Sequence, residues 1–217
     1  MKPNNMRKYE KKELDINVDE LPFQDFLTSR YSMTVRVNAQ KTFDFCKKNN
    51  YPFFNITTAC ILEAVNEIPE FKRRIIDKKV YEYEKINGVS PIIQDDNTIR
   101  EIEISPLSEH ESLDSFNTSI ENKKEDIKHN QYLVEPSLRD VQPICNLSCI
   151  PWINFDSMTN IIASPNQIMP VISWGKLVDG KIPVSVTASH IFIFGYHFKL
   201  FYEKLEKYLE NPELLKK

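Results

Sequence analysis

In the stretch PVSVTASHIFIFGYHFK, Pro183–Lys199, the spacing of apolar residues changes from that of a strand to that of a helix. Its first half alternates between apolar and small polar side chains, which is the two-residue period of a strand with one buried face. From Tyr196 onward, apolar residues recur every three or four positions, as they do in an amphipathic helix. We therefore expect a strand that ends near Ser189, a turn through Gly195, and then a helix.

His190 lies at the end of this expected strand. A strand end that turns into a helix is a common place to present one reactive side chain from a rigid base. An imidazole group has an unperturbed pKa of about 6.5, so its neutral form accepts a proton near neutral pH. The pattern therefore favours a general base. The alternative is a packed or surface histidine without a chemical role.

The composition is that of an ordinary globular protein. Of 217 residues, 41% are apolar and 27% are charged, and the net charge is −3. This length suits one domain spanning residues 1–217 with its own core, of which residues 1–12 form a charged segment. Basic residues are interspersed with acidic ones, so nothing predicts a nucleic-acid surface. No apolar run approaches the roughly 20 residues of a membrane span, and the N-terminus lacks the apolar region of a secretion signal.

Cysteine and glycine usage narrows the possible cofactors. The spacing of Cys46, Cys60, Cys145 and Cys149 does not match a zinc site, so we expect reduced thiols in the core of a cytoplasmic protein and no bound metal. The chain has only four glycines, which excludes a glycine-rich phosphate loop. Any nucleotide-like cofactor must therefore be held in another way.

The remaining patterns predict an α+β protein. Expected strands are 31–37, 80–83, 89–93, 98–104, 144–150, 167–176 and 181–189, and expected helices are 39–48, 52–68, 108–131 and the segment after 195. Asn87-Gly88 predicts a tight hairpin turn between two of these strands, and Asp179-Gly180 predicts another. We expect a mostly antiparallel or mixed sheet with helices packed on it.

Three motifs resemble those of the chloramphenicol acetyltransferase family. The segment His190–His197 is similar to the family's His-x-x-x-Asp-Gly signature, with Phe194 in the place of the Asp. LSCIPWINFDS, Leu147–Ser157, resembles the family's Ser-x-x-Pro-Trp-x-x-Phe-x-Ser string, and is the most specific match because strings containing Trp rarely coincide by chance. MPVISWGK, Met169–Lys176, is similar to a family strand that ends in Lys. Weaker similarity extends over residues 20 to 210.

The resemblance implies a coenzyme A-dependent acyltransferase fold and a homotrimer, in which the histidine of one subunit faces the substrate pocket of the next. His190 would be the general base, and Ser148 would donate a hydrogen bond to the oxyanion of the intermediate. Ser173, in the place of a family threonine, would help to hold a water molecule there. Trp152 and Lys176 would bind acetyl-CoA, whose phosphates attract a cation.

One departure from the family concerns the brace of the histidine. The resemblance implies an ion pair between the motif's Asp and an arginine near the N-terminus, but residue 194 is Phe and residues 19–22 contain no arginine. Because both partners are missing together, no buried charge is left unpaired. We hypothesise that Phe194 packs against Leu21, Phe23 or a neighbouring side chain and replaces the ion pair.

A second departure concerns the acceptor. The family's Arg-x-x-His-Phe motif becomes Glu20–Phe23, and its Thr-Val-Phe-His wall becomes Ile104–Leu107, so the pocket for the small-molecule alcohol is altered. We expect Phe23, Phe26 and Tyr31 to line it. The resemblance implies an acetyl-CoA-dependent O-acetyltransferase. One alternative is a trimeric relative that binds coenzyme A or a small molecule with weak catalysis. Another is the acyltransferase core of a 2-oxo acid dehydrogenase complex, disfavoured by the lack of a lipoyl domain and flexible linker.

Overall fold

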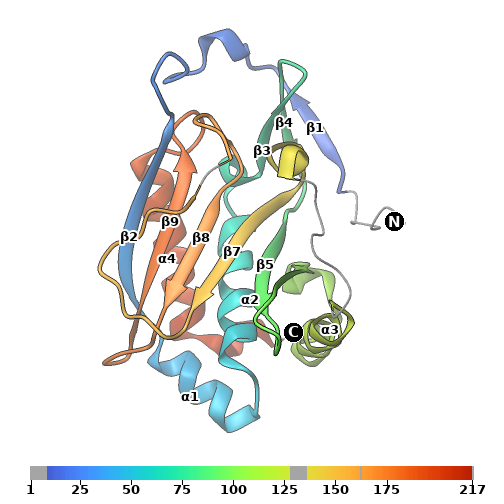
Figure 1. Cartoon of the computed structure of the whole chain (residues 1–217), viewed down its shortest axis with the longest axis vertical. Helices are drawn as coiled ribbons and strands as arrows, with labels where there is room; N and C mark the ends of the chain where they lie inside the picture. The colour runs from blue at the N-terminus through green and yellow to red at the C-terminus, as the bar shows by residue number, and fades with distance from the viewer. Residues whose placement is uncertain (1–8, 128–135, 162, 217) are drawn as a thin grey trace.

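A six-stranded mixed sheet forms the centre of the molecule, with the order β2-β9-β8-β7-β5-β6 (Figure 1). The computed structural model describes residues 9–127, 136–161 and 163–216. A second sheet has the order β1-β4-β3. The strands are β1 (Lys11–Leu14), β2 (Arg30–Asn38), β3 (Arg73–Ile76), β4 (Lys79–Tyr83), β5 (Asn87–Ile93), β6 (Ile99–Ile104), β7 (Ile144–Ile150), β8 (Val171–Gly175) and β9 (Lys181–Ser189).

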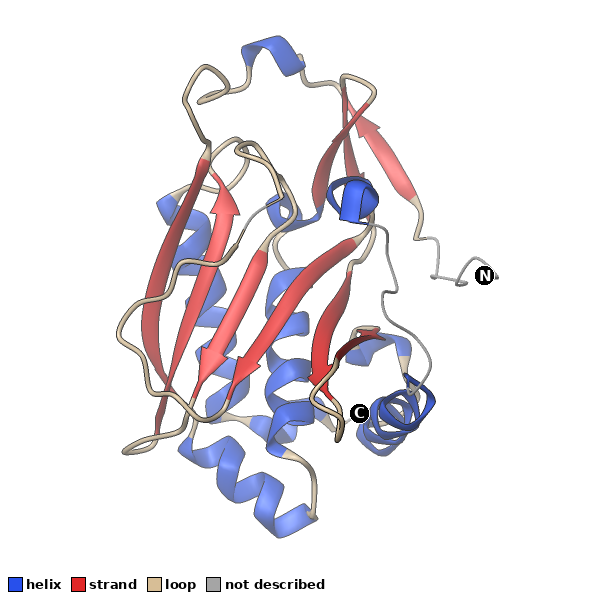
Figure 2. Cartoon of the chain, in the orientation of Figure 1, coloured by secondary structure: helices blue, strands red, loops and turns tan. Residues whose placement is uncertain are grey.

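Two helices cover one face of the large sheet (Figure 2). The helices are α1 (Gln40–Asn49), α2 (Phe53–Asn66), α3 (Leu113–Asp126) and α4 (Gly195–Glu210), with short 3-10 helices at Val18–Glu20, Pro69–Lys72, Leu107–Glu109, Pro136–Val141 and Pro212–Leu215. In Figures 1 and 2, α2 and α4 lie behind the strands. The apolar positions of β9 and the Phe198–Phe201–Leu205 stripe of α4 are buried in one core, because alternation in the strand and the helical period each align apolar side chains on one face.

The opposite face of the large sheet is polar although it is buried. Ser173 and Ser185 are fully buried on adjacent positions of β8 and β9. The segment that connects β7 to β8 crosses this face and satisfies both hydroxyls. Ser173 donates to Asn160 Oδ1 (2.6 Å), and Ser185 donates to the carbonyl oxygen of Met158 (2.8 Å). The connection thus follows the sheet because buried hydroxyls require partners.

The predicted hairpin at Asn87-Gly88 is wrong. Both residues lie inside β5, and β4 and β5 belong to different sheets. Gly88 has no positive φ, but a Cβ on it would lie only 2.4 Å from Leu147 Cδ1. This glycine therefore permits close packing of β5 on its neighbours and does not make a turn. At Asp179-Gly180 the prediction is confirmed, because both residues have positive φ (50° and 75°) between β8 and β9, as a type I′ turn requires.

The other predicted elements agree with the structure apart from their ends. The strands 144–150 and 181–189 match β7 and β9, whereas β1 and β3, of four residues each, were not predicted because their sequences are short and highly charged. The helix expected from residue 108 begins at Leu113, since Ser112 and Ser115 form a capping box there. Its residues 128–131, like residues 1–8 of the charged N-terminal segment, lie outside the described residues. Within the described chain, no helix has the length and apolar character needed to cross a bilayer.

Candidate active site

His190 immediately follows β9 at the edge of the sheet shared with β2. Its backbone N–H donates to the carbonyl oxygen of Ser29 (2.7 Å), one residue before β2 begins. The hydroxyls of Ser29 and Ser189 are also hydrogen-bonded to each other (2.9 Å) and are buried. The backbone that carries the imidazole is therefore tied to a neighbouring strand.

Aromatic rings surround the imidazole of His190. The ring of Phe23 lies 4.1 Å from it, the ring of Tyr31 stacks on it at 4.6 Å, and the ring of Phe194 meets it edge-on at 5.0 Å. Phe23 has a φ of 63°, an uncommon conformation for a bulky residue that occurs mostly where a site imposes it. Within the described residues, Nδ1 of His190 is buried without a hydrogen-bond partner. Such an atom calls for a partner from outside the described chain.

Of the three side chains expected to line the acceptor pocket, those of Phe23 and Tyr31 contact the ring of His190 directly. Phe26 contacts Phe23 (5.4 Å between ring centroids) and is largely exposed, so it lies in a second row. Phe194, expected near Leu21 or Phe23, has its ring against His190 and also 5.6 Å from His197.

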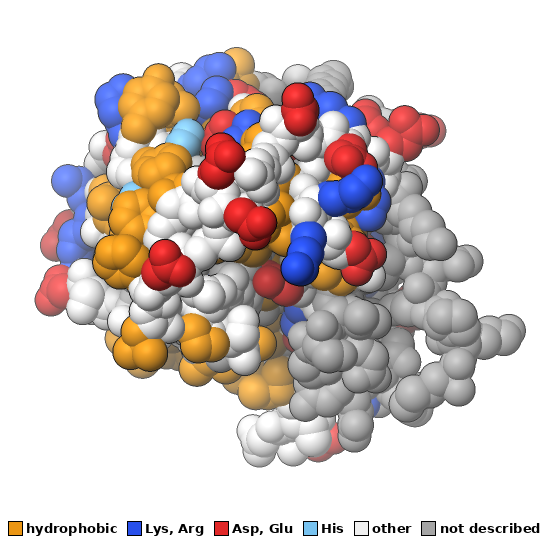
Figure 3. All heavy atoms as spheres, turned by 90° about the horizontal axis from the view of Figure 1, so that it is seen from above, with side chains coloured by type: hydrophobic (Ala, Val, Ile, Leu, Met, Phe, Trp, Pro, Cys, Tyr) orange, Lys and Arg blue, Asp and Glu red, His pale blue; other side chains and the backbone are white. Residues whose placement is uncertain are grey.

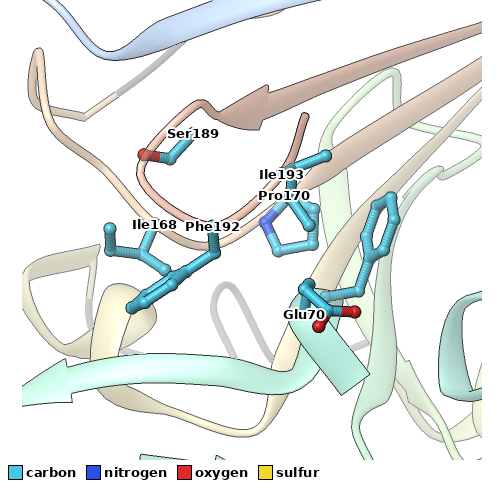
Figure 4. A pocket seen from close by; sticks show the side chains of 7 residues that line it. Glu70, Ile168, Pro170, Ser189, Phe192 and Ile193 are labelled. Carbon is cyan, nitrogen blue, oxygen red and sulfur yellow. The ribbon is translucent and has the colours of Figure 1, made fainter. Parts of the chain in front are cut away.

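Behind the His190 turn, side chains from several segments converge around a gap that is too small for a water molecule (Figure 4). The gap is lined by Glu70, Phe71, Ile168, Pro170, Ser189, Phe192 and Ile193. Most of these side chains are buried, so the inner side of the turn is closely packed.

Ser148 and Ser173 lie side by side in the sheet, far from His190 of the same chain. Ser148 of β7 is paired with Ser173 of β8, which is paired with Ser185 of β9. His190 follows five residues after Ser185 and two strands away from Ser148, which corresponds to roughly 19 Å. β7 and β8 run toward one end of the sheet and β9 toward the other (Figure 1). One chain alone does not bring Ser148 to His190.

The sequence of this chain matches a known protein family over most of its length. The family model described as chloramphenicol acetyltransferase matches residues 10–206 of the chain. This chain belongs to the chloramphenicol acetyltransferase family. Two curated members are chloramphenicol acetyltransferase 3 of Escherichia coli, 23% identical over 192 residues (86% of each chain), and chloramphenicol acetyltransferase of Bacillus pumilus, 21% identical over 186 residues (83% of each chain).

Solved structures support the same family and a wider fold group. A chloramphenicol acetyltransferase structure superimposes with a TM-score of 0.78 at 26% identity, covering 91% of this chain and 100% of that chain. The dihydrolipoamide acetyltransferase of Azotobacter vinelandii superimposes with a TM-score of 0.62 at 13% identity, covering 87% and 84%. This second likeness shows a shared fold alone.

In this family member, the segments that carry Trp152 and Lys176 meet where β7 and β8 end. The N–H of Lys176 donates to the carbonyl oxygen of Ile153 (2.8 Å), and both predicted cofactor-binding side chains are exposed. Gly175 makes this approach possible, because a Cβ there would lie 2.5 Å from the same carbonyl oxygen. The backbone of Lys176 therefore lies beside the residue that follows Trp152.

The four cysteines do not offer a thiolate in this family member. They are free, and burial raises the pKa of Cys46, Cys145 and Cys149 to about 12, and that of Cys60 also upward. At neutral pH these groups are protonated thiols with weak nucleophilicity. Across the described residues, no group of three His, Cys, Asp or Glu side chains is arranged to hold a metal ion.

Sequence reasoning missed the residues that support the predicted ones. Asn160 accepts from Ser173 and donates to Thr187 Oγ1 (2.9 Å), and Thr187 in turn is hydrogen-bonded to Ser32 (2.7 Å). Nothing in the local pattern around Asn160 marks it, since its two partners lie on two different strands, β8 and β9. His197, by contrast, was visible in the quoted stretch as the histidine after Gly195.

Proposed function

We propose that this protein is an acetyl-CoA-dependent O-acetyltransferase that acts on a small-molecule alcohol. The family membership supports an acyltransferase, and the surroundings of His190 support its role as the general base. The observation that carries the proposal is the imidazole of His190, flanked by Phe23 and Tyr31 at an edge of the sheet with a buried, unpaired ring nitrogen. The flanking rings hold the imidazole in a fixed orientation, which a general base requires.

In the proposed reaction, Nε2 of His190 takes the proton of the acceptor hydroxyl as its oxygen attacks the thioester carbonyl of acetyl-CoA. Ser148 donates a hydrogen bond to the oxyanion that forms on that carbonyl oxygen. The intermediate then collapses, the carbon–sulfur bond breaks, and the coenzyme A sulfur leaves with the proton from His190. No acyl-enzyme forms, which agrees with four protonated thiols.

Ser173 has a defined orientation for its proposed supporting role. Its proton is directed to Asn160 Oδ1, so its remaining lone pairs can only accept hydrogen bonds. A water molecule near the intermediate would donate to Ser173 and keep its other proton for the oxyanion. This arrangement supports the prediction that Ser173 holds such a water.

The proposed active site is formed between subunits of a homotrimer. His190 and Ser148 of one chain are too far apart to act on one substrate, so the histidine would meet the serine of a neighbouring copy. Because these two surfaces are different, the contact is heterologous, and a heterologous contact closes into a ring when the rotation between copies permits it.

Exposed apolar side chains support such a contact at both surfaces. Near His190, the side chains of Phe26, Leu27 and Tyr196 are 62%, 93% and 63% exposed. After β7, Trp152, Ile153 and Ile161 are 67%, 55% and 94% exposed. Figure 3, seen from the upper end of Figure 1, shows hydrophobic side chains gathered around histidine side chains on one part of this face. Exposed apolar groups of this kind mark interaction or ligand surfaces.

The proposed acetyl-CoA site consists of Trp152 and Lys176. Trp152 would pack against the cofactor, and the exposed ammonium of Lys176 would attract a phosphate. Phe23, Phe26 and Tyr31 would line the acceptor pocket, which favours an uncharged acceptor with apolar or aromatic parts. We place the protein in the cytoplasm as part of this proposal, since four free thiols suit a reducing compartment.

Thiol release from acetyl-CoA, measured with chloramphenicol and with a panel of other aromatic alcohols, tests the proposal. We expect turnover by the parent protein and a loss of about 10²–10⁴-fold in His190→Ala. Tyr81→Phe is the control, since Tyr81 lies on β4 in the second sheet, and it should keep most of the activity. Equal turnover in the parent and in His190→Ala would overturn the role of His190.

A second candidate is a trimeric relative that binds coenzyme A or a small molecule without effective turnover. The absence of the family's Asp–Arg pair, with Phe194 at the Asp position, favours this candidate. Calorimetric binding of coenzyme A together with no thiol release for any hydroxyl acceptor would support it over the enzyme.

A further inference from the structure

One peptide group in the turn after His190 is hydrogen-bonded by side chains at both of its polar atoms. The hydroxyl of Tyr31 donates to the carbonyl oxygen of Ile193 (3.0 Å). The N–H of Phe194, the other end of the same peptide group, donates to Nδ1 of His197 (2.9 Å). Tyr31 belongs to β2 and His197 to the first turn of α4, so the peptide is tied to two separate elements.

We propose that Tyr31 and His197 are positioning residues that together fix the 193–194 peptide group and thereby the imidazole of His190. We name this pair of hydrogen bonds the clasp. Its role rests on the proposed function of His190. The clasp replaces the ion pair that the family motif would supply. Where that motif uses the side chain of residue 194, this chain uses the peptide group of the same residue.

The Tyr31 arm of the clasp also contacts the imidazole itself. Its ring stacks on His190 with an interplanar angle of 21°, and its other side meets Phe198 of α4 edge-on at 4.9 Å. Burial raises the pKa of Tyr31 to about 12. The hydroxyl therefore stays protonated and available as a donor throughout the physiological range.

The His197 arm works only in one protonation state. Because Nδ1 accepts the Phe194 N–H, the ring proton lies on Nε2, which points toward Glu70 Oε2 at 3.8 Å. Glu70 is in turn paired with Arg73 (3.0 Å). This is half of a capping box: the third helical residue accepts from the N-cap backbone, while Phe194 has no side-chain acceptor to return the bond.

The clasp acts where the close packing of the turn ends. Ile191, Phe192 and Ile193 are buried, whereas the ring of Phe194 is 38% exposed and so gives limited anchoring. The two hydrogen bonds fix the peptide group that joins the buried part of the turn to the exposed part.

Tyr31→Phe, which keeps the stacked ring and removes the hydroxyl, tests one arm, and His197→Ala tests the other. In each we expect kcat to fall about tenfold while the KM for acetyl-CoA stays within about twofold, because the imidazole is misplaced but the cofactor site is intact. His197→Gln supplies a neutral acceptor at the same helical position and should recover most of the loss. Amide hydrogen exchange at Phe194 should be faster in His197→Ala than in the parent and in His197→Gln.

Tyr202→Phe is the control, since its hydroxyl also donates to carbonyls of β2 and β9, those of Met33 and Val184, away from His190. It should leave kcat and the nitrogen-15 chemical shifts of the His190 ring near those of the parent, whereas Tyr31→Phe should move these shifts. The exchange and chemical-shift measurements need no turnover, so they test the clasp even if the parent is inactive. Unchanged shifts in Tyr31→Phe and unchanged Phe194 exchange in His197→Ala would overturn it.

Discussion

At the residue scale, the environment of His190 is aromatic where the family motif has a carboxylate. Phe194 presents a ring edge to the imidazole, and Phe23 and Tyr31 present their faces. In the proposed function, ring contacts and the hydrogen bonds of the turn therefore hold the imidazole where the resemblance implies an ion pair.

His197 gives this arrangement a pH dependence. Burial lowers the pKa of His197 below its ordinary value of 6.5, opposed by the carboxylate of Glu70 and assisted by the guanidinium of Arg73; the other groups in contact are the uncharged rings of Phe194 and Tyr196. The neutral form is thus favoured in the folded state. Its contribution to stability is fully present above about pH 6.5 and is lost as the pH falls through the lowered folded-state pKa.

Urea unfolding of the parent and of His197→Gln between pH 8 and pH 5 checks this sign. Glutamine does not titrate, and all other groups are common to both proteins, so they cancel in the difference. We expect the free energy of unfolding of the parent to fall relative to that of His197→Gln as the solution becomes acidic. A relative gain by the parent would show that Glu70 dominates and that the protonated form is preferred.

At the element scale, close backbone contacts decide how the strands are arranged. Gly88 packs β5 against Leu147 of β7 and Leu62 of α2, and Gly175 lets the end of β8 approach the turn after β7. The second contact brings Lys176 beside Ile153 and thus near Trp152. Two of the four glycines therefore lie where a side chain would push neighbouring elements apart, and one of them, Gly175, lies beside the proposed cofactor site.

Gly88→Ala should destabilise the protein by about 1–3 kcal/mol, because the new methyl group overlaps Leu147. Leu147→Ala removes the overlapping atoms and alone should cost about 2–5 kcal/mol. We expect the double variant to lose less stability than the sum of the two, as measured by urea unfolding and a double-mutant cycle. Additive losses would contradict the direct contact.

At the scale of the whole molecule, the proposed function joins His190 of one copy of the chain to Ser148 of a second copy, because one chain holds the two residues far apart. It also makes a prediction about mixed trimers that does not depend on the identity of the acceptor. In a ring, each site takes its histidine from one subunit and its serine from the next. Two inactive variants can therefore complement each other if the active sites lie between subunits.

Denaturing and refolding His190→Ala together with Ser148→Ala in equal amounts should restore about a quarter of the parent activity, since one site in four then combines an intact histidine with an intact serine. Each variant refolded alone should stay inactive by thiol release from acetyl-CoA. Light scattering on the same samples gives the oligomeric state. Mixed samples that form trimers without activity would contradict a site shared between subunits.

The two sheets also bear on the number of domains. Val80 and Tyr83 of β4 belong to the same apolar cluster as Val184 and Val186 of β9. We propose on this basis that residues 1–217 form one domain, as the length predicts. A shared core of this kind couples the two sheets in folding.

The sequence by itself determined the elements whose signal is local. The alternation of Pro183–Ser189 and the helical period after Tyr196 correctly predicted β9 and α4, because each pattern repeats within one element. The motif strings also identified His190, Ser148 and Ser173 as candidates. Tertiary structure alone decided that Asn87-Gly88 is a strand and not a turn, since the deciding neighbour, Leu147, is 59 positions away from Gly88 in the chain. It alone joined Tyr31 of β2 to Ile193 in the turn after β9, because a hydrogen bond between segments far apart in sequence leaves no trace in the local order of residues.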